Sequence, residues 1–251
     1  MLKELKSLVH HGKQFVPDLR KQGVSPLFRG RPYIAGDIIV NDIKAAAAIC
    51  PTGAIDNETG CLDLGRCVFC RECEFLKPGK IKFTNDYRIA SNDRNSLIIK
   101  PGDESPVRLD EASVRKEVRK LFSGSLKLRQ VSAAGDNSGE MELGACGNVN
   151  FDMGRFGIEF VASPRHADGI VITGPVSENM ARALEITFEA VPEPKIIILA
   201  GTDAISGGIF EGSPALDRSF IENHHIDLYV PGNPAHPLTF INGVMDLLGI
   251  K

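Results

Sequence analysis

The chain has 251 residues, of which 43% are hydrophobic and 24% charged, and its formal net charge at pH 7 is -3. This composition is ordinary for a globular protein of one or two domains, and the slightly acidic charge excludes a generally basic surface that coats nucleic acid. No apolar run reaches the roughly 18–20 residues that span a bilayer, and the N-terminus has no signal-peptide core, so we expect a cytoplasmic location. There, the six cysteines are expected to bind metal or to do redox chemistry rather than to form disulfides.

The first half of the chain combines a short helix with a cysteine-rich segment. Residues 1–32 carry seven Lys or Arg against two Asp or Glu, and apolar residues recur at helical spacing, which predicts a basic amphipathic helix: Leu2, Leu5, Leu8 and Val9. Residues 81–84 have the composition of a short strand. A helix is predicted over 110–122 with Asp110 as its N-cap, and the polar, glycine-containing stretch 133–142 is predicted to be a loop.

In the second half, apolar segments alternate with helix-like segments. Residues 169–173 and 195–200 are almost entirely apolar and predict buried strands, with a helix over 178–191 between them. A third short strand is predicted at 227–230 and a closing helix at 238–248. Strand–helix–strand order with apolar strands predicts a parallel sheet that helices cover on both faces.

The spacing of three cysteines is the strongest chemical signal in the sequence. Cys67, Cys70 and Cys73 form C-x2-C-x2-C, the core of the bacterial ferredoxin run C-x2-C-x2-C-x3-C-P that binds iron–sulfur clusters. The fourth position of that run is Lys77, followed by Pro78, so the run by itself lacks one ligand.

Cys50 supplies the missing ligand, because in two-cluster ferredoxins the fourth cysteine of each run binds the other cluster. Cys50 opens the segment CPTGAI, which is typical of the end of a first run, and the first three positions of that run hold apolar residues: Val40, Ile43 and Ala46. All the missing ligands therefore belong to one cluster and all the remaining ones to the other. This sorting predicts one [4Fe–4S] cluster, with iron bound by Cys50, Cys67, Cys70 and Cys73.

Two alternatives remain for these four cysteines, a zinc site and a set of reduced structural thiols. Cys61 fits no ligand position, and we interpret it as a buried thiol without a role in binding.

Two long resemblances cover most of the chain. Residues 1–95 resemble the two-cluster ferredoxin-like subunit of formate hydrogenlyase and related energy-converting hydrogenases, through FRGRP at 28–32, CPTGAI at 50–55 and GRCVFCRECE at 65–74. Residues from about 118 onward resemble the small subunit of membrane-bound [NiFe] hydrogenases, which is related to the iron–sulfur subunit of complex I next to the quinone site. The matching segments are LFSGSLKLRQV at 121–131, GAC at 144–146, RFGIEFVASPRHADGIVITGPV at 155–176, PEPKIII at 192–198, AISGGIFEGS at 204–213 and DLYVPGNPAHP at 227–237. The chain thus resembles a fusion of two neighbouring subunits.

The second resemblance implies a cluster site whose ligands are mostly lost. The family binds its proximal [4Fe–4S] cluster with four cysteines, and the corresponding positions here are Cys146, Val149, Asp203 and Asn233, with a deletion before Arg155 as the alternative for the second of them. One thiolate and one carboxylate do not hold a conventional cubane, so the resemblance implies that the proximal cluster is absent. The alternatives for this region are a replacement metal site that includes His236, a small-molecule pocket in the vacated space, and a repacked core.

Together these observations predict an α/β chain with a small ferredoxin-like α+β domain over 1–95, a linker and helix over 96–125, and a flavodoxin-like domain with a mainly parallel sheet over 126–251. The resemblance implies an electron-transfer subunit that carries one [4Fe–4S] cluster. Its implied partners are a hydrogenase- or complex I-like large subunit and membrane subunits, which would place it on the inner face of the cell membrane. No acid–base pair or nucleophile stands out, so catalysis by this chain alone is not predicted, and neither is a nucleic-acid partner. A non-redox adaptor and a small-molecule binding module are the alternative functions.

Overall fold

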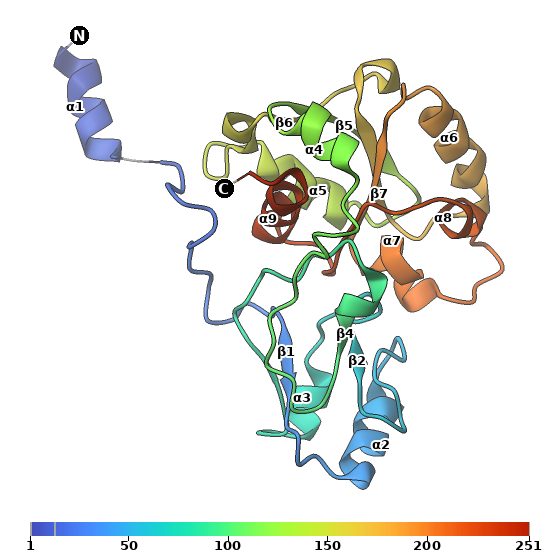
Figure 1. Ribbon diagram of the computed structural model, residues 1–251. Coiled ribbons are helices and arrows are strands. Elements are labelled where there is room, and N and C mark those ends of the chain that lie inside the picture. Colours follow the sequence, from blue (N-terminus) through green and yellow to red (C-terminus); the bar gives the residue numbers. More distant parts are fainter. Residues whose placement is uncertain (1, 13, 251) are drawn as a thin grey trace.

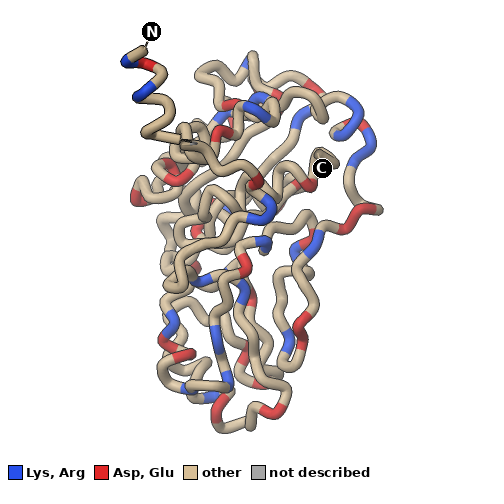
Figure 2. The backbone as a smooth tube through the Cα atoms, turned by 90° about the vertical axis from the view of Figure 1, so that its left-hand side faces the viewer, with Lys and Arg blue, Asp and Glu red and all other residues tan. Residues whose placement is uncertain are grey.

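The computed structural model describes residues 2–12 and 14–250 and has two units with an outlying helix (Figure 1). The larger unit is built on a five-stranded sheet, and the smaller unit lies below it in that view. Helix α1 (Leu2–His11) projects from the body, and one side of it lines an open hollow together with residues of the larger unit. Acidic and basic residues are interspersed over both units (Figure 2).

The five-stranded sheet of the larger unit is wholly parallel. Its spatial order is β6 (Ile158–Phe160), β5 (Leu126–Ser132), β7 (Gly169–Thr173), β8 (Ile196–Ala200) and β9 (Leu228–Val230). Numbered from the first of these strands in the chain, the order is 2-1-3-4-5, which is that of flavodoxin-like folds. The predicted fold class is thereby confirmed, and the strands expected at 169–173, 195–200 and 227–230 are present.

Helices cover both faces of this sheet (Figure 1). One face carries α4 (Lys116–Phe122), α5 (Ser138–Cys146) and α9 (Pro237–Leu248), and the other carries α6 (Glu178–Glu189), α7 (Thr202–Ser206) and α8 (Ser219–Asn223). Successive side chains of β8 alternate between the two cores, with Ile196 and Ile198 facing α9 and Ile197 and Leu199 facing α6. The strand is apolar throughout because both of its faces are buried.

The smaller unit has two short antiparallel pairs and its own core. Strand β1 (Pro32–Ile34) pairs with β3 (Ile81–Phe83), which confirms the strand expected near residue 81, and β2 (Leu62–Asp63) pairs with β4 (Ile98–Ile99). Its helices are α2 (Val40–Ile49) and α3 (Glu72–Leu76). Four 3-10 turns complete the regular structure of the described residues: Arg94–Leu97, Met153–Phe156, Pro164–His166 and Gly208–Phe210.

The two units are hydrogen-bonded to each other along one edge of the sheet. Ser91 exchanges two backbone hydrogen bonds with Tyr229 of β9, of 3.0 and 2.8 Å. The Thr202 hydroxyl, at the start of α7, donates a hydrogen bond of 2.7 Å to the carbonyl oxygen of Cys67. Both contacts are buried, so they fix the smaller unit against the carboxyl ends of the strands.

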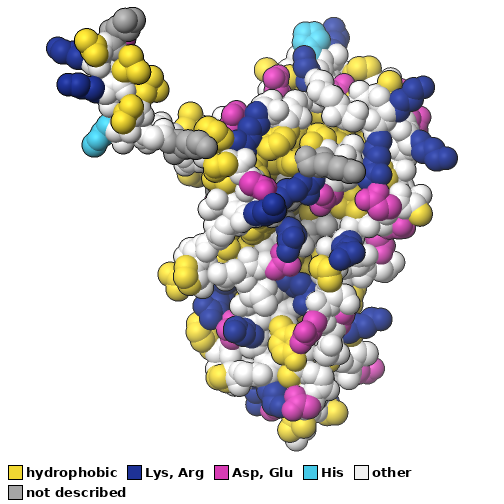
Figure 3. Space-filling view, turned by 60° about the vertical axis from the view of Figure 1, so that its left-hand side comes forward, with side chains coloured by type: hydrophobic (Ala, Val, Ile, Leu, Met, Phe, Trp, Pro, Cys, Tyr) yellow, Lys and Arg dark blue, Asp and Glu magenta, His cyan; other side chains and the backbone are white. Residues whose placement is uncertain are grey.

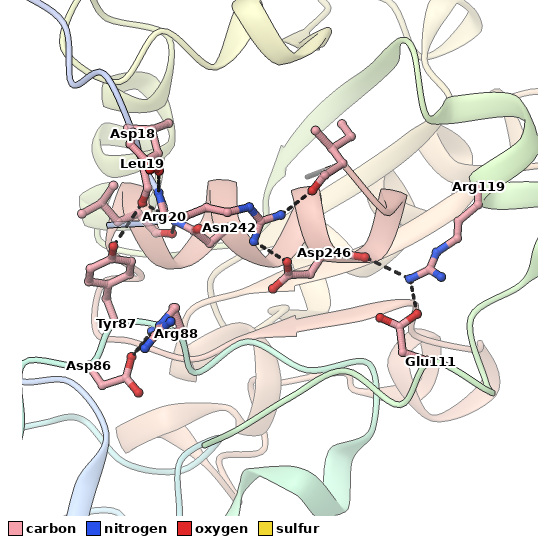
Figure 4. Close-up of polar contacts among 12 residues, drawn as sticks. Asp18, Leu19, Arg20, Asp86, Tyr87, Arg88, Glu111, Arg119, Asn242 and Asp246 are labelled. Carbon is pink, nitrogen blue, oxygen red and sulfur yellow. Dashed lines mark hydrogen bonds and ion pairs between the residues drawn. The ribbon is translucent and has the colours of Figure 1, made fainter. Parts of the chain in front are cut away.

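The chain segment that follows α1 is anchored on α9 (Figure 4). The carbonyl oxygen of Leu19 accepts hydrogen bonds from the Tyr87 hydroxyl at 3.1 Å and from Asn242 Nδ2 at 3.0 Å. Arg20 forms an ion pair of 2.5 Å with Asp246. Leu19 is therefore part of the core of the larger unit, although it precedes the smaller unit in the sequence.

Two predicted elements differ from the structure. The helix expected over 110–122 is wrong in its first half, because the Asp110 carboxylate accepts a hydrogen bond from Ala112 N and closes a turn, and α4 begins only at Lys116. The loop expected over 133–142 is interrupted by α5, which begins at Ser138. Strands β5 and β6 were not predicted.

Candidate metal centre

The four cysteines of the predicted cluster line one cavity in the smaller unit. Its free volume is about 10 Å³, and both apolar side chains and the charged residues Arg71 and Glu72 complete the wall. Cys67 and Cys73 are buried, whereas Cys50 and Cys70 are half-buried. The structure thus brings together residues from two separate segments, as the exchanged-ligand pattern requires.

Bent backbone brings the cysteines of the second segment around the cavity. Phe69 and Arg71, on either side of Cys70, have φ values of 53° and 70°, in the left-handed region that costs a residue with a side chain about 1 kcal/mol or more. The guanidinium group of Arg71 is held by the Glu74 carboxylate with hydrogen bonds of 2.6 and 3.0 Å. Such strained conformations persist where the surroundings impose them, often at functional sites.

Backbone amides point at two of the sulfur atoms. Ala54 N donates to Cys50 Sγ at 3.2 Å, and Phe69 N donates to Cys67 Sγ at 3.3 Å. Hydrogen bonds to cysteine sulfurs stabilise thiolates and tune iron–sulfur clusters.

Burial acts in the opposite direction on Cys67, and it acts on Cys73 as well. Loss of solvent raises the pKa of Cys67 and raises the pKa of Cys73 to about 11. A thiolate is therefore costly here unless a cation lies beside it, and metal coordination deprotonates thiols outright.

The four cysteines line the cavity without forming a closed set of ligands around one ion. Among residues 2–12 and 14–250, no three His, Cys, Asp or Glu side chains converge on a site for one ion. A tetrahedral zinc ion with Zn–S bonds of about 2.3 Å would place its sulfurs roughly 4 Å apart. The donor set of four thiols suits a [4Fe–4S] cluster, and it is also a ligand set that structural zinc uses.

The positions that would hold a second cluster are filled by protein. They lie on α2, where Ile43 and Ala46 are buried in the small core and Val40 is exposed. Lys77, at the missing fourth position, forms an ion pair of 2.6 Å with Asp42 of the same helix.

Cys61 lies outside the cysteine-lined cavity. It is half-buried rather than buried, so the expectation of a buried thiol was wrong in that respect.

A second cavity lies at the carboxyl edge of the parallel sheet. The residues after β5, β7, β8 and β9 line it, including Gly135, Gly174, Gly201 and Gly232. In a sheet with this strand order, the position beside β5 and β7 is the switch point at which ligands bind in related folds. Asp203 and Asn233, two of the four positions implied for the lost cluster, line this cavity together with Asp136 and Gly139.

The other two implied positions lie elsewhere. Cys146 is fully buried in the core between α5 and α9, where its Sγ donates a hydrogen bond of 3.4 Å to the carbonyl oxygen of Glu142 and burial raises its pKa. Val149 is 64% exposed and faces α1. The structure therefore does not bring Cys146 or Val149 to Asp203 and Asn233.

The second cavity is small and acidic. Its free volume is about 20 Å³, and no Lys, Arg, His or Cys of the described residues lines it. Burial, and then the charge of Asp136, raises the pKa of Asp203, whose Oδ1 atom is buried without a hydrogen-bond partner in the described part of the chain. An acidic lining disfavours phosphate as a ligand of this cavity.

His236 lies in a third, larger hollow between the two units, with a volume of about 570 Å³. Its ring packs edge-on against Phe28 and Phe151, its Nδ1 accepts a hydrogen bond from Leu238 N, and burial lowers its pKa. It does not line the cavity of Asp203, and the metal site proposed to combine the two is not formed.

The larger unit matches proteins of respiratory complexes. The family described as "NADH ubiquinone oxidoreductase, 20 Kd subunit" matches residues 137–247, from α5 to α9. The B subunit of NADH-quinone oxidoreductase from Geotalea daltonii is 40% identical over 107 residues, which are 43% of this chain and 62% of that protein. The probable membrane-bound hydrogenase subunit mbhJ of Pyrococcus furiosus is 33% identical over 115 residues, which are 46% of this chain and 69% of that protein.

The chain therefore belongs to the family of complex I- and hydrogenase-type subunits, while it spans about three fifths of the length of its relatives from NADH-quinone oxidoreductase. A chain from the membrane-bound sulfane sulfur reductase, an archaeal respiratory membrane complex, has a TM-score of 0.46 and 26% identity, over 53% of this chain and 74% of that one.

Proposed function

We propose that the chain is an electron-transfer subunit of a complex I- or hydrogenase-type assembly and that it carries one [4Fe–4S] cluster. The observation that carries this proposal is the single cavity lined by Cys50, Cys67, Cys70 and Cys73. These four residues would hold the cluster, which supplies a one-electron redox couple when bound. The amides of Ala54 and Phe69 would stabilise the charge on its ligand sulfurs.

The packing around the position of a second cluster supports a count of one cluster per chain. Helix α2 and the Lys77–Asp42 ion pair occupy the place where the ligands of another cluster would be. Removing this packing to admit a cluster would expose a buried helix face, which is costly.

We further propose that the larger unit carries no cluster. Asp136 and Gly139 are three residues apart, the spacing of the two-ligand motif in the family, and they line the cavity with Asp203 and Asn233. We infer that these positions, rather than Cys146 and Val149, correspond to the family's first two ligands. None of the four is a cysteine, and a carboxylate pair does not hold a cubane.

The proposed division of the chain is a ferredoxin-like domain over 1–95, a linker over 96–125 and a family domain over 126–251. The Thr202–Cys67 hydrogen bond would hold the cluster-binding loop against the family domain. The assembly would supply a large subunit and membrane subunits, so that the chain is peripheral to the inner face of the membrane.

Iron analysis tests the cluster directly. Protein purified anaerobically should contain about four irons per chain and, after reduction, show the electron paramagnetic resonance signal of one cubane. Cys70→Ser should lose the iron, whereas Cys61→Ser, the matched control outside the cavity, should keep it. Cys146→Ala should also keep its iron. About eight irons, a single zinc, or iron loss in the Cys146 variant would overturn the assignment.

Affinity purification under mild conditions tests the assembly. The chain should be recovered with a large subunit of the same complex type. Recovery of a monomer alone would contradict this part of the proposal.

A further inference from the structure

Helix α1 presents an apolar face that is largely exposed, and of its four aliphatic residues only Leu8 lines the open hollow that the helix shares with residues 147–149. It has no buried residue, and four aliphatic side chains on one side are between 54% and 79% exposed: Leu2, Leu5, Leu8 and Val9. Figures 1 and 3 show the helix projecting from the body, with hydrophobic side chains gathered along one side. A ten-residue helix is marginal in water on its own, so a surface that covers this face would stabilise it.

The flank of this apolar face is basic. At 100° per residue, Lys3, Lys6 and His10 fall on the adjacent side of the helix, and the lysines lie beside the hydrophobic side chains in Figure 3. Glu4 is the one acidic residue of the helix. Aliphatic residues on one side and lysines beside them match the pattern of helices that lie in the plane of a lipid surface.

The helix is attached to a fixed point on the body. Val16 N donates to the carbonyl oxygen of Asn150 at 2.8 Å, and Arg155 Nη2 donates to the carbonyl oxygen of Val16 at 2.6 Å. Leu19 and Arg20 are then held on α9 (Figure 4). A surface that binds α1 would therefore hold the whole chain close to it.

We propose that α1 binds the surface of an anionic lipid bilayer, with Leu2, Leu5, Leu8 and Val9 in the acyl boundary and Lys3 and Lys6 at the acidic headgroups. Charge complementarity selects this occupant, because the basic flank is attracted to acidic lipids. No described helix combines the length and apolarity needed to cross a bilayer, so α1 would lie on the surface. This inference is independent of the cluster and of the partner subunits.

The chain lacks tryptophan, so a single substitution gives a selective reporter. Full-length Leu8→Trp protein should show a blue-shifted emission on mixing with vesicles of phosphatidylglycerol and phosphatidylcholine, and little change with phosphatidylcholine alone. A blue-shifted emission before any lipid is added would mean that α1 folds back onto residues 147–152, and this would overturn the proposal.

Charge and apolar variants in the Leu8→Trp background separate the two contributions. Lys3→Gln with Lys6→Gln should weaken partitioning about 25-fold, since each lysine near an acidic surface contributes about fivefold. Leu5→Ser with Val9→Ser should abolish the blue shift. The matched control Lys116→Gln with Lys120→Gln makes the same charge change on the exposed side of α4 and should bind like the parent. Equal loss in this control, or binding of α1 only to a partner protein and to neither vesicle, would refute a lipid site.

Discussion

The Thr202 hydroxyl gives the sharpest test of how the two units are held together. It is fully buried and donates to the carbonyl oxygen of Cys67 at 2.7 Å, with the carbonyl oxygen of Gly232 at 3.1 Å as a second neighbour. Thr202→Val keeps the shape of the side chain and removes the donor. The Gly232 oxygen keeps its hydrogen bond from Thr202 N, whereas the Cys67 oxygen loses the hydroxyl as its donor.

A buried carbonyl left without a partner costs about 1–3 kcal/mol, so the free energy of unfolding of Thr202→Val should fall by that amount. Urea denaturation followed by circular dichroism measures the change. Thr187→Val is the matched control, because its hydroxyl donates to the Ala183 oxygen on an exposed helix face. The free energy of unfolding of this control should stay within about 0.5 kcal/mol of the parent value. If both variants lose the same amount, the hydroxyl of Thr202 does not couple the units.

Three further predictions concern stability. Gly174→Ala should lower the free energy of unfolding by more than about 2 kcal/mol, because φ is +78° and the new Cβ would lie 2.4 Å from Gly135 N. Gly144→Ala, which has open space around the new Cβ, should instead raise it by about 0.5 kcal/mol. Equal effects in chemical denaturation would contradict the steric argument. Burial lowers the pKa of His236 in the folded state, so the unfolded chain takes up the proton first and stability should fall as the pH drops below about 6.5. The variant His236→Asn keeps an N-cap acceptor and should show a weaker pH dependence in thermal melts. An unchanged pH dependence in this variant would refute the assignment to His236. Lys77→Met should lower the free energy of unfolding by up to about 1 kcal/mol, because it removes a half-buried ion pair with Asp42. A double-mutant cycle with Asp42→Asn measures the coupling between the two side chains, and a coupling energy of zero would exclude the pair as a stabilising contact.

The parallel sheet was predictable where a strand is buried on both faces. Residues 169–173 and 195–200 are apolar because helices pack on either side, and this pattern is visible without a structure. Strand β5 was missed because its outward positions include Lys127 and Arg129, which interrupt the apolar pattern.

The start of α4 depends on contacts that lie far away in the sequence. Arg115 donates to Asp227 at 2.9 Å and to the carbonyl oxygen of Lys195 at 2.6 Å, so the chain remains extended there and the helix begins at the next residue. Local spacing carries no information on such a contact.

The cysteine-lined cavity was predictable because its four cysteines lie at a diagnostic spacing in the sequence. The cavity at the strand ends of the larger unit was not predictable in full, because neither Asp136 nor Gly139 is a cysteine that would mark it. Cys146 was expected at this cavity because it is the one thiol of that region, yet it is buried in the hydrophobic core. Without cysteines, this cavity can be recognised only from the strand ends that meet there.

The paired backbone of Ser91 and Tyr229 has a consequence for association between molecules. Strand β9 is the last strand of its sheet, and an open strand edge is a template on which another chain can add. Ser91 satisfies the amide and the carbonyl of Tyr229, and the smaller unit covers that side of the sheet. The smaller unit thus covers the edge of β9. Residues 126–251 expressed without it would leave this edge strand unpaired, which favours aggregation.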